Sequence, residues 1–125
     1  MEVNLWPDFS RSDLPPTPKS IIEDAGEGLK EKTDSLVRFY IAGVSFSEGF
    51  ANVRCTLYAS KLLYHYPFLT AKFPMVKHYP VELTVDKLEQ TIVANDQPQL
   101  LQALEKVFNM PSTVETISQL IGLSK

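Results

Sequence analysis

The chain has 125 residues, of which 44% are hydrophobic and 22% are charged, and its formal net charge is −3. This length predicts a single domain that can bury a core, and the slightly acidic balance gives no reason to expect DNA or RNA as a partner. Cys55 is the only cysteine, which excludes an intramolecular disulfide and a thiolate-rich metal site.

The sequence predicts an arm over residues 1–16 and one α+β domain over residues 17–125. The arm lacks a basic region followed by an apolar one, so we expect no secretory signal. No apolar run approaches the roughly 20 residues that a membrane span needs, and we expect a cytoplasmic protein. Trp6, Phe9 and Leu14 stand among polar residues and prolines, which predicts a segment that lies over the body or over a partner. The sequence does not decide between the two.

Thr17 and Pro18 predict the start of a helix that continues to about Lys32, because Thr is a good N-cap and Pro suits the first turn. Gly26 and Gly28 weaken this helix by about 1 kcal/mol each relative to alanine. We expect it to persist because apolar residues recur on one face at helical spacing: Ile21, Ile22, Ala25 and Leu29.

From Asp34 the apolar period changes to two, which predicts strands. A phase slip at Gly43 predicts a β-bulge. Residues 47–49 predict a three-residue hairpin connection with Gly49 in the left-handed conformation. The returning strand alternates, so that one face carries Val53, Cys55, Leu57 and Ala59. Cys55 is therefore predicted to be a buried and inert thiol.

Strand character continues over residues 63–64, resumes around residues 73–77 and is clear again over residues 79–85. Three prolines remove ladder donors here and predict edge-like or interrupted strands: Pro67, Pro74 and Pro80. Residues 86–89 fit either a helical turn or a loop, and residues 90–93 predict a short last strand.

Two short amphipathic helices are predicted at the C-terminus. Asp96 with Gln99, and Ser112 with Glu115, are capping-box pairs that predict where they begin, and Gly122 predicts where the second one ends. The sequence thus predicts an N-terminal helix, an antiparallel sheet of about four to five strands joined as hairpins, and two C-terminal helices. We expect the helices to cover one face of the sheet.

The tripeptide His-Tyr-Pro occurs twice, and it contains the only two histidines, His65 and His78. A chain reversal at Ala71 and Lys72 would place these histidines opposite each other, with Cα atoms about 5 Å apart. Two facing histidines would give a mild pH sensitivity below about pH 6.5. The repeat would then reflect strand register rather than a catalytic site.

The sequence contains no motif that supports catalysis. The two histidines lack the spacing of zinc ligands, and His65 and Tyr66 face opposite sides of a strand. No nucleophile elbow or phosphate-binding glycine loop is present. We therefore expect no catalytic residue, no metal and no cofactor.

The function predicted from these patterns is that of a non-catalytic domain that binds a protein partner or a second copy of itself. The candidate interaction surface consists of aromatic residues and histidines: Trp6, Phe9, Tyr64, His65, Tyr66, His78 and Tyr79. Two alternatives stay open. The first is an enzyme or small-molecule binder with a pocket near His65 or His78. The second is a single-stranded nucleic-acid binder that uses a basic and aromatic sheet face.

Residues 64–68 (YHYPF) and 77–81 (KHYPV), followed by a capped C-terminal helix, resemble segments of small bacterial proteins of uncharacterised function. Some of these proteins open with an arm similar to residues 4–7 (NLWP). The resemblance implies a bacterial, cytosolic protein, and it implies no functional residues.

Overall fold

The computed structural model describes residues 5–9, 14–86 and 88–125. Within these residues, five strands form one sheet: β1 (Val37–Ser47), β2 (Phe50–Ala59), β3 (Tyr64–Pro74), β4 (Val81–Val85) and β5 (Gln90–Ala94). The same described part contains four α-helices and one short 3-10 helix: α1 (Pro18–Glu27), α2 (Leu29–Lys32), η1 (Ser60–Leu62), α3 (Gln97–Phe108) and α4 (Pro111–Ser124).

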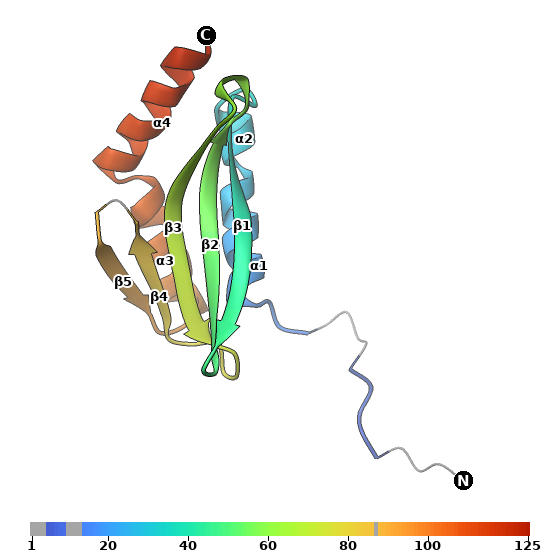
Figure 1. The fold of residues 1–125 in the computed structure, drawn as a ribbon. Coiled ribbons are helices and arrows are strands. Elements are labelled where there is room, and N and C mark those ends of the chain that lie inside the picture. The colour runs from blue at the N-terminus through green and yellow to red at the C-terminus, as the bar shows by residue number, and fades with distance from the viewer. Residues whose placement is uncertain (1–4, 10–13, 87) are drawn as a thin grey trace.

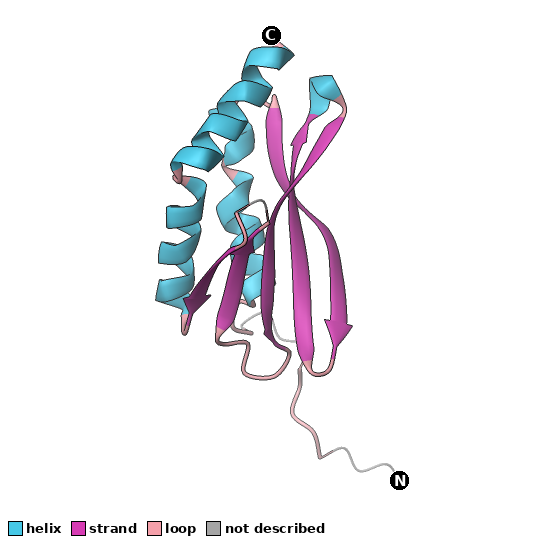
Figure 2. Ribbon diagram, turned by 60° about the vertical axis from the view of Figure 1, so that its left-hand side comes forward, coloured by secondary structure: helices cyan, strands magenta, loops and turns pink. Residues whose placement is uncertain are grey.

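The sheet is antiparallel, and its strands lie in sequence order from β1 to β5. Each strand therefore pairs with the one before it in the chain. The helices pack on one face of the sheet and leave the other face open (Figures 1 and 2). This arrangement confirms the predicted α+β fold, with helix, sheet and two further helices in that order.

The hairpin between β1 and β2 uses a two-residue turn. Ser47 pairs with Phe50, and the residues between them, Glu48 and Gly49, have φ angles of 52° and 85°. Positive φ at both positions gives the turn a twist that matches two antiparallel strands. The left-handed Gly49 is confirmed. The predicted three-residue connection is wrong, because this turn type needs only two residues and Ser47 stays in the strand.

The predicted β-bulge in β1 is confirmed, since the register between β1 and β2 shifts between Ile41 and Gly43. An added Cβ at Gly43 would lie 2.5 Å from Nη2 of Arg54. The guanidinium of Arg54 therefore lies against the glycine, and a larger residue at this position would require the end of the arginine side chain to move.

The two His-Tyr-Pro tripeptides do not pair with each other. β3 runs through Ala71 and Lys72 without interruption, so the predicted chain reversal is wrong. His65 lies opposite Tyr58 of β2, and His78 lies in the connection between β3 and β4, with a φ of 69°. The expected pH sensitivity of two facing histidines therefore has no basis in this fold.

The two prolines within β3 are tolerated because neither interrupts its pairing with β4. That pairing covers Leu69–Lys72, and Pro67 lies next to a register shift in the pairing with β2. Proline is found at such bulges and outside fully paired segments. The chain reverses at η1 and Leu63, whose φ of 50° is left-handed. The strand predicted over residues 63–64 therefore begins only at Tyr64.

Residues 86–89, for which the sequence fits either a helical turn or a loop, lie in a turn as far as they are described. Asp86, Leu88 and Glu89 connect β4 to β5, and Lys87 lies outside the described residues. The short last strand is confirmed as β5, which pairs with β4 along its length.

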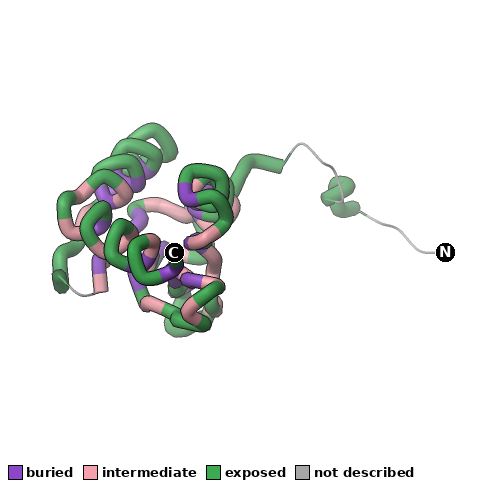
Figure 3. The backbone as a smooth tube through the Cα atoms, turned by 90° about the horizontal axis from the view of Figure 1, so that it is seen from above, coloured by how far each residue is buried: buried purple, intermediate pink, exposed green. Residues whose placement is uncertain are grey.

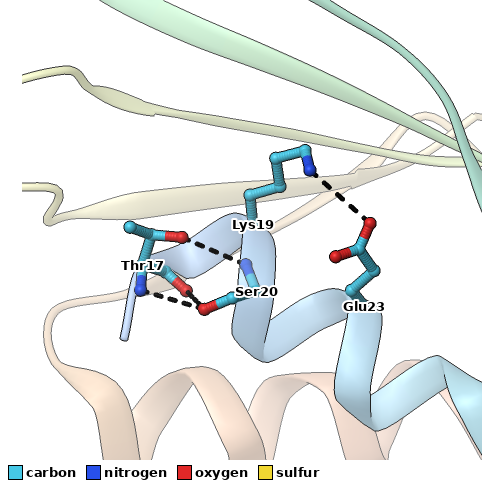
Figure 4. A network of polar contacts seen from close by, with 4 residues as sticks. All are labelled: Thr17, Lys19, Ser20 and Glu23. Atoms are coloured by element: carbon cyan, nitrogen blue, oxygen red, sulfur yellow. Dashed lines mark hydrogen bonds and ion pairs between the residues drawn. The ribbon is translucent and has the colours of Figure 1, made fainter. Parts of the chain in front are cut away.

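Helix α1 begins at its predicted N-cap. Oγ1 of Thr17 accepts a hydrogen bond from the amide of Ser20 at 3.1 Å, and Oγ of Ser20 accepts one from the amide of Thr17 at 3.0 Å (Figure 4). This reciprocal pair satisfies two amides that the first turn would otherwise leave unpaired. The helix is not continuous to Lys32, because α1 ends before Gly28 and α2 begins after it.

Helix α3 also begins as predicted, with Oδ1 of Asp96 accepting a hydrogen bond from the amide of Gln99 at 2.9 Å. The start predicted for α4 is wrong, because its N-cap is Met110 and no side chain caps it. Thr113 instead donates a hydrogen bond to the carbonyl of Val107 at 2.8 Å, which joins α4 to the end of α3. The predicted end at Gly122 is also wrong, since α4 continues to Ser124.

The core lies between the helices and the sheet, as the buried segments in Figure 3 show. The strand face predicted to be apolar is confirmed, since Val53, Cys55, Leu57 and Ala59 are all buried. Its counterpart on the helices includes fully buried side chains from both ends of the chain: Ile22, Leu100, Leu104 and Val107.

Candidate functional site

The open face of the sheet carries an aromatic cluster, which we define as Tyr40, Tyr58 and His65. These residues come from β1, β2 and β3: Tyr58 pairs with His65, and Tyr40 pairs with Thr56, two residues along β2 from Tyr58. The hydroxyl of Tyr40 lies 2.7 Å from Nδ1 of His65, within hydrogen-bond distance. The rings of Tyr58 and His65 are stacked, with centroids 4.4 Å apart. His65 is thus held between two tyrosines on the solvent side of the sheet.

Charge is unevenly distributed over this open face. Arg38, Arg54 and Lys72 come from β1, β2 and β3, whereas Glu82 lies on β4 opposite Lys72. The ammonium of Lys72 also lies 4.6 Å from the ring centroid of Phe50, a cation–π contact. The face is therefore basic and aromatic over β1–β3 and turns acidic at β4.

The predicted interaction residues do not form one surface. His65 faces the open side, whereas Tyr64 and Tyr66 face the helices because neighbours in a strand point to opposite sides. The Tyr64 and Tyr66 rings are 6.5 Å apart, and Tyr66 packs against the core. The structure brings His65 together with Tyr40 and Tyr58 instead.

His78 and Tyr79 belong to the connection between β3 and β4, which leaves β3 at the end opposite to that of His65. The ring of His78 contacts Phe73 edge-on, with centroids 6.1 Å apart. The hydroxyl of Tyr79 is buried without a hydrogen-bond partner among the described residues. Burial, and to a lesser extent the Asp96 carboxylate, raises the pKa of Tyr79 above its ordinary value.

The arm presents apolar side chains to solvent. The exposed fractions are 86% for Leu5, 78% for Trp6, 63% for Phe9 and 61% for Leu14. Residues 5–9 lie away from the helices and the sheet (Figures 1 and 3). The rest of the predicted arm before Leu14, residues 1–4 and 10–13, is outside the described part.

A pocket of about 310 Å³ lies on the other side of the sheet, between the α1–α2 junction and the α3–α4 junction. Its floor is formed by three side chains of the sheet: Phe39, Leu57 and Phe68. Gly28 and Lys32 line one side, and Phe108 lines the other. Neither histidine is among the lining residues. Both glycines of the first predicted helix, Gly26 and Gly28, line this pocket, but glycines in a helix do not by themselves indicate one.

The thiol of Cys55 is part of the core rather than of a site. Burial, and secondarily the Asp86 carboxylate, raises the pKa of Cys55 to about 12, whereas an unperturbed thiol titrates near pH ~8.5. Above pH ~8.5 the unfolded chain loses this proton while the native protein keeps it, so the free energy of unfolding falls as pH rises towards 12. Below pH ~8.5 both states are protonated, and Cys55 contributes no pH dependence.

We therefore expect Cys55→Val to remove this component of alkaline destabilisation. The stability of the unsubstituted protein relative to the variant is expected to fall by about 1.3 kcal/mol between pH ~8 and pH ~9.5. Urea unfolding at the two pH values measures the difference, and lysine and tyrosine titrations cancel because both proteins share them. Parallel stability curves for the two proteins would show that the thiol is not held protonated by burial.

In the described residues, no three His, Cys, Asp or Glu side chains gather closely enough to hold a metal ion. Within that same part, no helix is long and apolar enough to cross a bilayer. Comparisons with protein-family models, curated proteins and solved structures found no match. The bacterial resemblance therefore stays a prediction.

Proposed function

We propose that the protein is a non-catalytic interaction protein that binds a protein partner through its apolar arm, the side chains of Leu5, Trp6, Phe9 and Leu14. The observation that carries this proposal is their exposure, which is 61% or more at each of the four positions. They occur within ten consecutive residues, and further strongly exposed apolar side chains, such as Val76 and Leu123, lie on the body.

Most of the apolar surface of these four side chains is exposed to water. Burying a large apolar side chain stabilises a structure by about 1.5–3 kcal/mol, and the exposed arm obtains little of this. The body has its own core of fully buried residues and does not need the arm to complete it. Burial against a second protein would supply the missing stabilisation. Tryptophan is among the residues that dominate such interfaces.

The aromatic cluster of Tyr40, Tyr58 and His65 supports the same proposal as a second contact surface. Its three rings are ordered by mutual packing and by one hydrogen bond, so little side-chain entropy remains to be lost on binding. Tyrosine is favoured at interfaces, where its apolar ring can be buried while its hydroxyl contacts water or a polar group.

The test compares a double substitution in the arm, Trp6→Ala with Phe9→Ala, with a matched substitution on the body, Val76→Ala with Leu123→Ala. Each pair removes two exposed apolar side chains. Tagged forms of the three proteins are recovered from the native cell, and co-purifying proteins are quantified. We expect the arm variant to recover at least about tenfold less of the partner, because two anchors at about 1 kcal/mol each or more are lost. Equal recovery by all three proteins contradicts the proposal.

Sedimentation velocity of the purified protein shows whether the partner is a second copy of the chain or a different protein. If the partner is a second copy, the unsubstituted protein and the body variant associate and the arm variant sediments as a monomer. If the partner is a different protein, all three are monomeric alone, and only the recovery experiment distinguishes them.

The open face supports a second candidate function, the binding of single-stranded nucleic acid. Tyr40, Tyr58 and His65 share this face with Arg38 and Arg54, and such a combination can stack bases and attract phosphates. We expect Arg54→Gln to weaken binding of a labelled oligothymidine and to lower its salt dependence. Fluorescence anisotropy at low and moderate salt measures this, and no binding at low salt eliminates the candidate.

A further inference from the structure

We propose that the pocket between the helices and the sheet binds a small amphipathic anion, a carboxylate with an apolar body of medium length. The pocket volume of about 310 Å³ lies at the lower end of the range for small-molecule sites. This site is separate from the arm and from the open sheet face, so the inference does not rest on the proposed interaction function.

The interior of the pocket selects an apolar body. Three phenylalanine rings meet there, with Phe39 edge-on to Phe68 at 6.2 Å and edge-on to Phe108 at 5.6 Å between centroids. Aromatic and aliphatic walls of this kind favour an alkyl chain or a ring that is removed from water.

Two polar groups of the pocket wall are already engaged within the helices. The hydroxyl of Thr113 donates to the carbonyl of Val107 at 2.8 Å, and the side-chain amide of Asn109 donates to the carbonyl of Glu105 at 2.8 Å. These donors are therefore not available to a ligand without breaking an existing hydrogen bond.

Lys32 supplies the charge that selects the head group. It lines the pocket from the last residue of α2 and is exposed, and its ammonium has no ion-pair partner among the described residues. A cationic side chain on the wall of an apolar pocket is complementary to a ligand with an anionic head and an apolar body. A charge-assisted hydrogen bond to a carboxylate is about twice as strong as a neutral one.

Gly28 lines the pocket without a side chain. A Cβ added at Gly28 would meet no atom within 4 Å, and its φ of −67° and ψ of −17° suit any L-residue. A larger side chain at this position can therefore be introduced without backbone strain, and it would occupy space at the pocket wall. A substitution at Lys32 therefore removes the contact with the head group, and a substitution at Gly28 separately removes the space for the apolar body.

The experiment uses isothermal titration of the full-length protein with decanoate and with decanol, both below their aggregation limits. We expect decanoate to bind about tenfold more tightly than decanol, in keeping with one charge-assisted contact. Lys32→Met should reduce this preference to about twofold or less while leaving the affinity for decanol unchanged. Gly28→Leu should weaken both ligands at least about tenfold, because the leucine displaces part of the apolar body.

Each variant has a matched control. Lys30→Met removes a nearby lysine that does not line the pocket, and Gly122→Leu adds a leucine at another helical glycine with open space around it. Both controls should bind as the unsubstituted protein does. Amide chemical shifts of the unsubstituted protein give an independent readout, with changes expected at Gly28, Leu29 and Asn109 and not at Tyr58.

The proposal is overturned by any of three results. These are the absence of saturable binding by either ligand, equal affinity for decanoate and decanol, or shift changes confined to the open face of the sheet. Loss of folding in Gly28→Leu does not rescue the proposal, because the lysine variant and the chemical shifts test it independently.

Discussion

Gly26→Ala is expected to lower the free energy of unfolding by about 2–3 kcal/mol, although alanine is the better helix former by about 1 kcal/mol. A Cβ at Gly26 would lie 2.0 Å from Cδ1 of Phe39 and 2.6 Å from its Cγ. The ring can give way only towards the pocket that it lines, and this movement breaks its edge-on packing against Phe68 and Phe108. Either helix α1 or the Phe39 ring must move, and the close packing between this helix and the sheet is lost.

The control for this substitution is Gly28→Ala, two residues further along the chain. Its backbone is right-handed helical and the added methyl meets no atom within 4 Å. We expect a gain of about 0.5–1 kcal/mol, because alanine restricts the unfolded chain more than glycine does. Urea unfolding of the two variants side by side measures both effects. Equal changes in the same direction would show that α1 does not approach the sheet as closely as described.

Leu104→Ala is expected to cost about 2–5 kcal/mol, the range for truncating a leucine in a packed core. Leu104 is 1% exposed and belongs to the face of α3 that packs on the sheet. Leu101→Ala on the same helix is the matched control, since Leu101 is 46% exposed, and we expect it to cost less than about 1 kcal/mol.

Chemical denaturation distinguishes the two α3 variants by the shift of the unfolding midpoint at an unchanged slope. A similar loss in both variants would mean that the helix packs with a different face. A loss below about 1 kcal/mol in Leu104→Ala would mean that the site collapses around the deleted side chain or was never tightly packed.

The sequence predicted the architecture because local patterns determine it. Alternation over Val53–Ala59 assigned the buried face of β2, and the glycine at position 43 marked the bulge. The caps at Thr17 and Asp96 are made by side chains that lie three residues from their partners. Such short-range contacts can be predicted from one short segment of the sequence at a time.

The errors occurred where a long-range contact overrides a local pattern. The sequence symmetry around Ala71 predicted a hairpin, but pairing of β3 with both β2 and β4 keeps that segment extended. The capping box at Ser112 is unused because Thr113 bonds back to α3.

The candidate sites were only partly predictable for the same reason. An arm before the first helix could be anticipated from its lack of periodicity, but its position relative to the body could not. The partners of His65 could not, because Tyr40 lies twenty-five residues earlier in the chain and meets it only through strand register. The pocket could not be predicted either, since its walls come from helices at both ends of the chain.

The most direct test of the proposed function uses the only tryptophan in the chain, which lies in the arm. We expect Trp6 of the dilute, isolated protein to be freely quenched by acrylamide, because its side chain is 78% exposed. Quenching should become strongly hindered when the captured partner is added, or with rising protein concentration if the partner is a second copy. Hindered quenching in the dilute isolated chain would mean that the arm docks on its own body. Unchanged quenching in the complex would mean that the arm is not the binding segment, and either result would contradict the proposed function.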